Sequence, residues 1–222
     1  VFGFDARRTV ELNDVVCRQN SAEENAGCFY VAGMAVVNNG TSMLGNLAGQ
    51  GGCIYAAGGS DVSVVGGEFS GCQSSGNGGF MYASDGAAVT ITGGTVTESV
   101  AGRRAGVVYC SGDNNDLGGS RVAIEGGTFS NNQALELGGA IVAWGTTSGG
   151  LTPTVVTITG GLFSNNTAKF YGGFIFLEEL ASLSCQGATI SDHYAGDQGG
   201  AIYGRDATWV NSSCDLIGNG AP

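Results

Sequence analysis

The sequence predicts an all-β protein: a right-handed parallel β-helix of about seven to eight coils, each about 26 residues long. Three observations predict this solenoid. A unit with apolar residues at every second position recurs along the chain, glycine pairs stand at fixed places in it, and helical periodicity is nowhere sustained. One such unit cannot bury its apolar face alone, so neighbouring copies must stack. The right hand follows the usual rule for crossovers between parallel strands.

The repeating unit is clearest in residues 121–144, RVAIEGGTFSNNQALELGGAIVAW, where Val122 and Ile124 alternate with Ala123 and Glu125. The second copy fits only with one residue deleted between Asn46 and Gly51. We expect a single domain over residues 1–222, an excerpt of a longer chain, because neither end shows the polar cap that a solenoid needs. Successive copies begin 26 to 34 residues apart, at Val10, Val36, Val62, Val89, Val122, Val156, Leu183 and Trp209.

A polar column runs through the copies ten residues after these starting positions. We expect its amides to form an internal or corner ladder in which each side chain bonds the next, although asparagine also suits the left-handed turns of such corners. His193 is then a stand-in for asparagine rather than a catalytic partner of Asp192. The column reads Asn20, Asn46, Cys72, Ser99, Asn132, Asn166, His193 and Asn219.

The strand that follows the glycine pair is apolar on both faces. Its first and third positions should share one face and its second position the other. We predict that the third position points outward, as an aromatic stripe that forms an interface, because contiguous exposed apolar surface usually marks an interaction site. The alternatives are that a segment outside this chain covers the stripe, or that the faces are reversed. The predicted stripe contains Tyr30, Tyr55, Tyr82, Tyr109, Phe176 and Tyr203.

Seven cysteines and three glycosylation motifs bear on the compartment. The cysteine spacing matches no zinc pattern. Cys28 and Cys53 share a column on adjacent coils, at a spacing of about 4.8 Å that falls inside the disulfide window, so we predict that bridge. Cys185 and Cys214 are the next candidates, and the odd total leaves at least one unpaired thiol. Together with possible glycosylation at Asn39, Asn165 and Asn211, this predicts an extracellular or cell-surface protein.

Two copies carry extra residues at the same corner, which should place the inserted loops 111–120 and 145–153 side by side. Asp113 and Asp116 in the first loop are weak candidates for a calcium site, but solvated acids are the simpler interpretation, and we expect no metal and no other cofactor. The net charge of −11 argues against nucleic acid and anionic membranes as partners. No apolar run approaches the ~20 residues of a membrane-spanning helix, so we expect no membrane insertion.

The residues do not predict an enzyme. A polysaccharide lyase or hydrolase would need clustered carboxylates, or a base near lysine or arginine, on one outer sheet. The outward positions of the first strand hold only Glu11 and Glu125 as acids, four coils apart. Arg103–Arg104 is interpreted as a solvated corner, and Glu178–Glu179 as a polar turn. An ice-binding face would need regular threonine ladders, which Ala123 and Glu125 interrupt.

Two tetrapeptides carry a family resemblance: GGAI, at Gly138–Ile141 and Gly199–Ile202, and FxxN, at Phe129–Asn132 and Phe163–Asn166. Together they resemble the repeats of chlamydial polymorphic outer-membrane proteins, which are surface adhesins with β-helical passenger regions. The resemblance covers nearly the whole chain, although several copies depart from it, such as the first with Cys17 in place of phenylalanine. It implies an adhesive, extracellular β-helix without catalytic residues. The acidic, glycine-rich composition also fits an algal-type eukaryotic surface protein with the same repeat.

The functional expectation is therefore a structural or adhesive extracellular module. Its stripe and open ends would contact copies of itself or other surface or filament proteins, laterally or end to end. The alternative is a carbohydrate-binding or polysaccharide-degrading β-helix that binds glycan near the two inserted loops.

Overall fold

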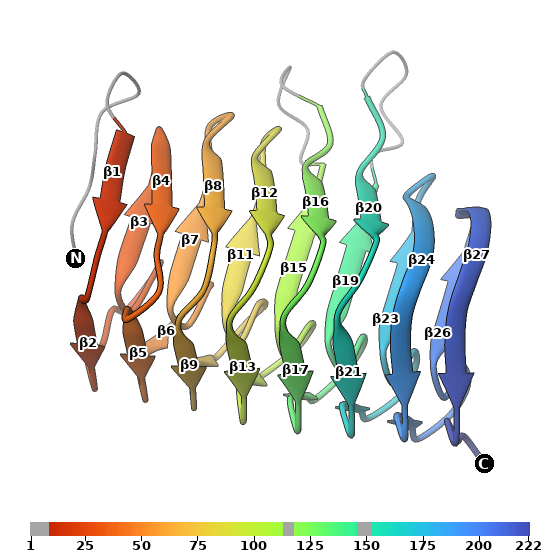
Figure 1. Cartoon of the computed structure of the whole chain (residues 1–222). Coiled ribbons are helices and arrows are strands. Elements are labelled where there is room, and N and C mark those ends of the chain that lie inside the picture. The colour runs from red at the N-terminus through yellow and green to blue at the C-terminus, as the bar shows by residue number, and fades with distance from the viewer. Residues whose placement is uncertain (1–8, 113–117, 146–151) are drawn as a thin grey trace.

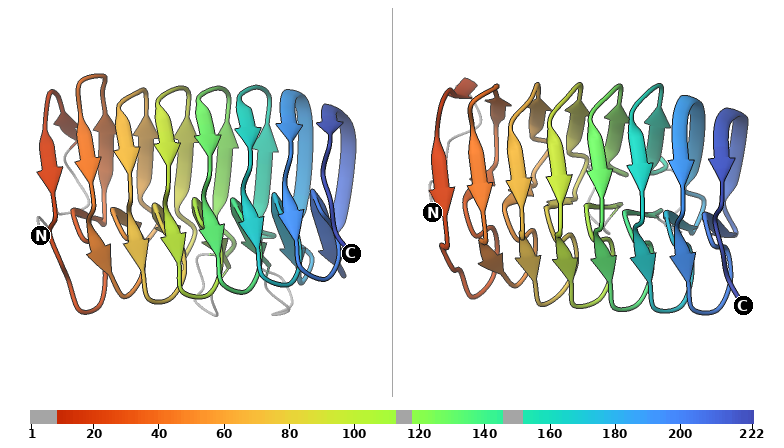
Figure 2. Two further views of the ribbon diagram at one scale, coloured as in Figure 1. Left: turned by 90° about the horizontal axis from the view of Figure 1, so that it is seen from below. Right: turned by 60° about the horizontal axis from the view of Figure 1, so that its bottom comes forward.

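The computed structural model describes residues 9–112, 118–145 and 152–222 (Figure 1). The regular structure in these residues is entirely β-strand, so the described chain contains no helix long and apolar enough to cross a membrane. Strands run down the front and up the back as the chain advances from the N- to the C-terminus, which is the right-handed sense (Figure 1). Two further views show the same single stack of coils (Figure 2). The predicted parallel β-helix is confirmed.

The front sheet receives strands from every coil and contains 14 strands, the last of which, β27, pairs with β24. In the last two coils the two strands fuse into one long strand. The upper strands are β1 (Thr9–Leu12), β4 (Met34–Val37), β8 (Asp61–Val64), β12 (Ala88–Ile91), β16 (Arg121–Ile124) and β20 (Val155–Ile158). The lower strands are β2 (Val16–Arg18), β5 (Ser42–Leu44), β9 (Glu68–Ser70), β13 (Thr95–Thr97), β17 (Thr128–Ser130) and β21 (Leu162–Ser164). The fused strands are β24 (Ser182–Ser191) and β27 (Thr208–Ile217).

Two further sheets complete each coil. The narrow sheet has six two-residue strands: β6 (Leu47–Ala48), β10 (Gln73–Ser74), β14 (Val100–Ala101), β18 (Gln133–Ala134), β22 (Thr167–Ala168) and β25 (Tyr194–Ala195). The back sheet has seven: β3 (Phe29–Val31), β7 (Ile54–Ala56), β11 (Met81–Ala83), β15 (Val108–Ser111), β19 (Ile141–Trp144), β23 (Ile175–Glu178) and β26 (Ile202–Arg205).

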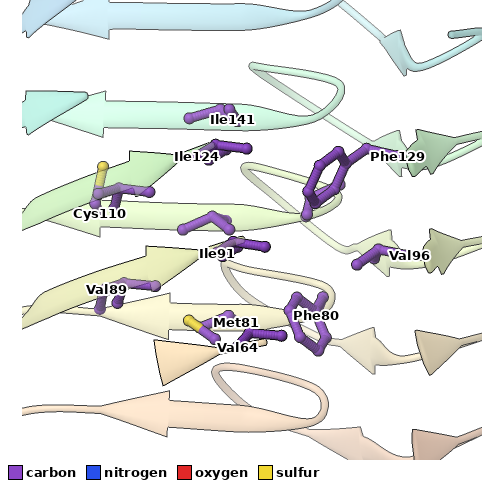
Figure 3. Packing of buried hydrophobic residues seen from close by; sticks show 14 of the residues in the cluster. Val64, Phe80, Met81, Val89, Ile91, Val96, Cys110, Ile124, Phe129 and Ile141 are labelled. Atoms are coloured by element: carbon purple, nitrogen blue, oxygen red, sulfur yellow. The ribbon is translucent and has the colours of Figure 1, made fainter. Parts of the chain in front are cut away.

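One continuous apolar core fills the space between the three sheets (Figure 3). Ile124 from the front sheet and Ile141 from the back sheet are both fully buried, and Phe129 stacks on Phe163 of the next coil with ring centroids 4.8 Å apart. The narrow sheet contributes small side chains such as Ala134, because its two-residue strands leave little room between the other two sheets. Stacking of identical positions thus continues the core from coil to coil.

The inward columns of Val122 and Ile124 are buried as predicted between the two end coils, whereas Trp209 in the last coil is 43% exposed, and the predicted start of the second copy is wrong by one residue. Ala35, not Val36, pairs with Val62 of the next coil, and Val36 is half-exposed. A turn in which the Thr41 N–H donates to the carbonyl of Asn38 holds the extra residue. The lower strand therefore returns to the predicted register.

Each glycine pair between the narrow and back sheets has two different roles. The first position needs a left-handed backbone, which Ala26 and Ala105 also adopt, with φ of 55° and 62°. The second position has no space for a side chain: a Cβ on Gly139 would overlap the Gly173 carbonyl oxygen and lie 2.6 Å from the Thr167 nitrogen. This second position is glycine in all seven coils: Gly27, Gly52, Gly79, Gly106, Gly139, Gly173 and Gly200.

The predicted amide ladder is confirmed, at the corner between the front and narrow sheets. Asn166 Oδ1 accepts hydrogen bonds from the backbone N–H and from Nδ2 of Asn132, both at 2.9 Å, while Asn166 Nδ2 donates to the carbonyl of Phe129 at 3.0 Å. The left-handed conformation belongs to the residue before each rung, such as Asn131 with φ 57°. Ladder and turn chemistry therefore both occur, on neighbouring residues.

His193 is a rung of this ladder and is 1% exposed. Its Nδ1 accepts the backbone N–H of Asn166 at 3.1 Å, and its ring stacks on Phe174 with centroids 5.3 Å apart. Burial lowers the pKa of His193 to about 4, although nearby backbone groups and Asp192 act in the opposite direction. The buried imidazole is therefore neutral, as an acceptor at Nδ1 requires.

We predict that Gly139→Ala lowers the free energy of unfolding by about 3 kcal/mol or more, because the new methyl group meets backbone atoms that cannot move independently. Gly58 is the matched control: its φ is +63° and the space around it is open. Gly58→Ala should lower the free energy of unfolding by only about 1 kcal/mol, the strain of an alanine in a left-handed conformation. Equal losses in urea unfolding would contradict the steric role of the second glycine.

The His193 rung predicts acid sensitivity. The pKa of His193 is lower in the folded than in the unfolded chain, so its contribution is complete above pH ~6.5 and is lost as the pH falls toward 4. The free energy of unfolding should fall by about 3 kcal/mol over this window. His193→Asn restores the amide and should remove the pH dependence that His193 causes. Urea unfolding at several pH values measures the free energy of unfolding of both proteins. An unchanged pH profile in this variant would show that other groups cause the acid sensitivity.

Candidate functional site

Four tyrosines stack into a continuous ladder on the outer side of the back sheet. The ring centroids of Tyr30 and Tyr55 are 5.1 Å apart, those of Tyr55 and Tyr82 4.9 Å, and those of Tyr82 and Tyr109 5.0 Å. The strands β3, β7, β11 and β15 pair in register, so each ring lies directly against the next. The stripe is formed as the alternation predicts, and its role as an interface stays a prediction.

The expectation that the first position of these strands shares the tyrosine face is wrong. Cys53 and Phe80 occupy that position, and both are buried in the core. The backbone explains the difference: the N–H groups of Cys53 and Ile54 both donate to the Phe80 carbonyl at 3.0 Å, so the chain turns between them. Two successive side chains consequently point inward, and only the third position faces out.

The C-terminal half of the stripe is closed by residues that the sequence reasoning missed. Tyr109 and Phe176 are only 5% and 2% exposed, in a small second apolar cluster outside the main core. Tyr171 stacks on Tyr203 at 4.8 Å, and Leu137 packs against the same cluster. Leu137 and Tyr171 both stand directly before a glycine pair, and this shared repeat position is the signal that could have identified them.

Charged residues pack around Trp144 at the edge of this closed half. The guanidinium of Arg104 lies 4.2 Å from the ring centroid of Trp144, whose Nε1 donates to Glu179 Oε2 at 2.9 Å. Glu178 is buried and forms an ion pair with Arg205. Arg104 is therefore not the solvated corner that the sequence predicted. Of the predicted polar turn, Glu179 does lie in a turn, whereas Glu178 is the buried end of β23, next to Trp144.

The N-terminal half of the stripe remains accessible. Tyr30, Tyr55 and Tyr82 are half-buried, and amide side chains take the place that Leu137 and Tyr171 occupy in the closed half. Gln50 Oε1 accepts the backbone N–H of Asn77 at 2.8 Å, which holds this amide against the next coil. Of the six predicted interface residues, those that keep accessible surface are Tyr30, Tyr55, Tyr82 and Tyr203.

The disulfides are Cys17–Cys28, Cys53–Cys72 and Cys185–Cys214. The predicted Cys28–Cys53 bridge is wrong. Cysteines stacked in register have parallel Cα–Cβ bonds, so their Cβ atoms lie about 4.8 Å apart, beyond the ~3.8 Å that a disulfide prefers. Cys28 bonds instead to the cysteine that faces it across its own coil.

The Cys185–Cys214 bridge is confirmed, and the geometry of β27 explains it. The direct strand partner of Cys185 is Ser212, and a register shift follows on this strand. Cys214 thus approaches Cys185 from an offset position rather than from the stacked one. Three disulfides indicate that the protein folds in an oxidising compartment.

Cys110 is the free cysteine among the described residues. Its Sγ lies 3.3 Å from the carbonyl oxygen of Val142, inside the core. Burial raises the pKa of the thiol to about 12, so the nucleophilic thiolate does not form at neutral pH. The residue acts as a small apolar side chain of the back sheet.

The remaining predicted sites are only partly described. Asn39 and Asn165 are exposed, as glycan acceptors must be, whereas the side chain of Asn211 lies outside the described part. Asp113 and Asp116 also lie outside it, and the described residues contain no group of side chains that could hold a metal ion. The stems of the two inserted loops do lie side by side: the Gly119 N–H donates to the Thr152 carbonyl at 2.8 Å.

Comparison with known proteins gives no assignment: no family model, no curated protein and no solved structure matches this chain.

The disulfide pattern predicts one thiol per chain that reacts only after unfolding. Cys110 should resist a thiol reagent in native buffer and react fully in denaturant without reductant. Peptide mapping of the unreduced protein should recover the 17–28, 53–72 and 185–214 pairs. Rapid labelling of the folded protein, or a recovered 28–53 peptide, would contradict this pattern.

Proposed function

We propose that this β-helix is a structural or adhesive extracellular module that contacts another protein chain through its back sheet. The observation that carries the proposal is the accessible tyrosine ladder of Tyr30, Tyr55 and Tyr82. Parallel sheets are normally covered on both faces, and their strands then read as continuous apolar runs. The back-sheet strands have this pattern, and Tyr30, Tyr55 and Tyr82 keep accessible surface on the outer face of the sheet.

The ring geometry favours a protein partner over a sugar. The rings of Tyr30, Tyr55 and Tyr82 are stacked with 6° between successive planes, so the ring faces between them are occupied by one another. Sugars bind aromatic residues through the ring faces, whereas a polypeptide can pack apolar side chains against ring edges. The ladder therefore offers an edge surface that suits another sheet or an extended chain.

The compartment supports the same proposal. The three disulfides require an oxidising environment, and Asn39 and Asn165 are accessible for glycosylation. The resemblance of the GGAI and FxxN repeats to those of surface adhesins is in keeping with a cell-surface or filament location. Partners of this class include copies of the same chain and other surface proteins.

A second candidate, binding of a neutral polysaccharide, is favoured by one observation on the front sheet. Its outer face carries an uncharged row of hydroxyl side chains spaced by about 4.8 Å, which could hydrogen-bond a hydroxyl-rich polymer. A glycan array separates this candidate from the protein interface. The row consists of Ser70, Thr97, Ser130, Ser164 and Ser191 on strands that pair in register.

We predict that Tyr55→Ser weakens association about tenfold or more, since a buried aromatic contact is worth at least 1.4 kcal/mol. The variant should remain folded, because each of the two ring contacts of Tyr55 is worth about 1 kcal/mol and the side chain is not part of the main core. Tyr194→Ser is the matched control, since Tyr194 is 50% exposed on the narrow sheet. Association of the purified protein is measured by analytical ultracentrifugation.

Nitration of native material supplies a test that needs no variant. Tyr55 should be protected in assemblies isolated from the natural source and reactive in the purified monomer, while Tyr194 reacts in both. Equal nitration of Tyr55 in both samples, together with unchanged association of Tyr55→Ser, would overturn the proposed interface.

A further inference from the structure

The N-terminal coils differ from the rest in charge. Between residues 9 and 102 the chain has one basic residue, Arg18, against eight acids: Glu11, Asp14, Glu23, Glu24, Asp61, Glu68, Asp85 and Glu98. Basic residues begin again on the fourth coil, where Arg103 and Arg104 both pair with Glu136, and Arg205 pairs with Glu178 in the last coil. The accessible part of the tyrosine ladder therefore belongs to an acidic half of the rod.

An open groove of about 420 Å³ lies in this acidic half, at the corner between the narrow and back sheets. Glu23 and Glu24 form one wall on the first coil, and Ser75 and Gly76 form the other on the third. Both glutamates are exposed, so their carboxylates are available to a ligand. Gly49 and Gln50 of the second coil lie between these walls.

The groove results from the one-residue deletion in the second coil. Five residues lie between Asn46 and Gly52, whereas six lie between Cys72 and Gly79 on the third coil. Hydrogen bonds to the neighbouring coils locate the deleted position. The Gly76 N–H bonds to the Gly49 carbonyl, and the Gln50 N–H, from the next residue in sequence, bonds to the Glu24 carbonyl. The missing residue is therefore the one that would stand between Glu24 and Gly76. The wall of the solenoid is therefore recessed at this coil.

The groove borders the column of residues that lies beside the tyrosine ladder. Asn25 and Gln50 line it and occupy the column directly before the glycine pair. That column packs beside the tyrosine column, as the Tyr171–Tyr203 stack at 4.8 Å shows in a later coil. Asn77 follows the lining residue Gly76, is 8% exposed, and its Oδ1 has no hydrogen-bond partner among the described residues. Amide side chains thus stand between the groove and the tyrosine column.

We propose that this groove and the adjacent tyrosines bind an extended, arginine- or lysine-rich segment of a partner protein. The basic side chains would reach the carboxylates of Glu23 and Glu24 and the carbonyl oxygens beside them. Their aliphatic stems, or neighbouring apolar residues, would lie against Tyr30 and Tyr55. The inference rests on the proposed back-sheet interface and specifies the chemistry of its partner.

The test uses the full chain and a fluorescein-labelled octa-arginine peptide, followed by fluorescence anisotropy at low and physiological salt. The double variant Glu23→Gln and Glu24→Gln should weaken binding at least tenfold. The control pair Asp61→Asn and Glu68→Gln removes the same charge from exposed positions of the front sheet and should change binding less than twofold. Circular dichroism checks that both double variants remain folded.

Two outcomes would overturn the inference: no binding of the peptide by the unaltered chain, or equal weakening in both double variants, which would leave only general attraction to an acidic protein. Nitration distinguishes this failure from failure of the proposed function. If the peptide test fails while Tyr55 stays protected in native assemblies, the interface stands and its partner is not basic. If Tyr55 is unprotected as well, both proposals fail.

Discussion

The close approach of backbone to backbone at the second glycine of each pair is the constraint on which the rest of this structure depends. A Cβ at this position would meet the carbonyl of the next coil and the strand of the narrow sheet, as Gly139 illustrates. The chain can therefore leave the narrow sheet and enter the back sheet only through glycine. This corner turns the first back-sheet residue inward, which in turn makes the third residue the one that faces out. The tyrosine ladder is thus a consequence of a corner several residues away.

Buried polar groups impose the second constraint. At the corner between the front and narrow sheets, backbone N–H and carbonyl groups leave the strand ladders, and buried groups of this kind need partners. An inward asparagine supplies both an acceptor and a donor to them, as Asn132 and Asn166 do. His193 supplies only the acceptor at Nδ1, and its buried Nε2 has no partner among the described residues. A ladder position therefore tolerates histidine only in its neutral form.

Much of this architecture could be predicted from the sequence, because stacking places equal repeat positions on top of one another. The inward columns, the amide ladder and the outward tyrosines follow from alternation and spacing alone. Errors arose where a feature depends on angles at a corner. Cys28 and Cys53 have suitable Cα spacing but parallel side chains, and the turn between Cys53 and Ile54 breaks the alternation. The shift from Val36 to Ala35 arose because a turn absorbed one residue without a change in the period.

The functional asymmetry of the rod follows from departures from the repeat. In the fourth to sixth coils, the position before the glycine pair is Arg104, Leu137 or Tyr171, and these side chains close the aromatic face with Trp144, whereas the last coil again has an amide there, Gln198. In the early coils the same position holds amides, which leave the tyrosine edges accessible. The coil that lacks one residue lies among these open coils and beside the acids Glu23 and Glu24. A perfect repeat would present one uniform face, so the residues that break the repeat are the ones that create a local binding surface.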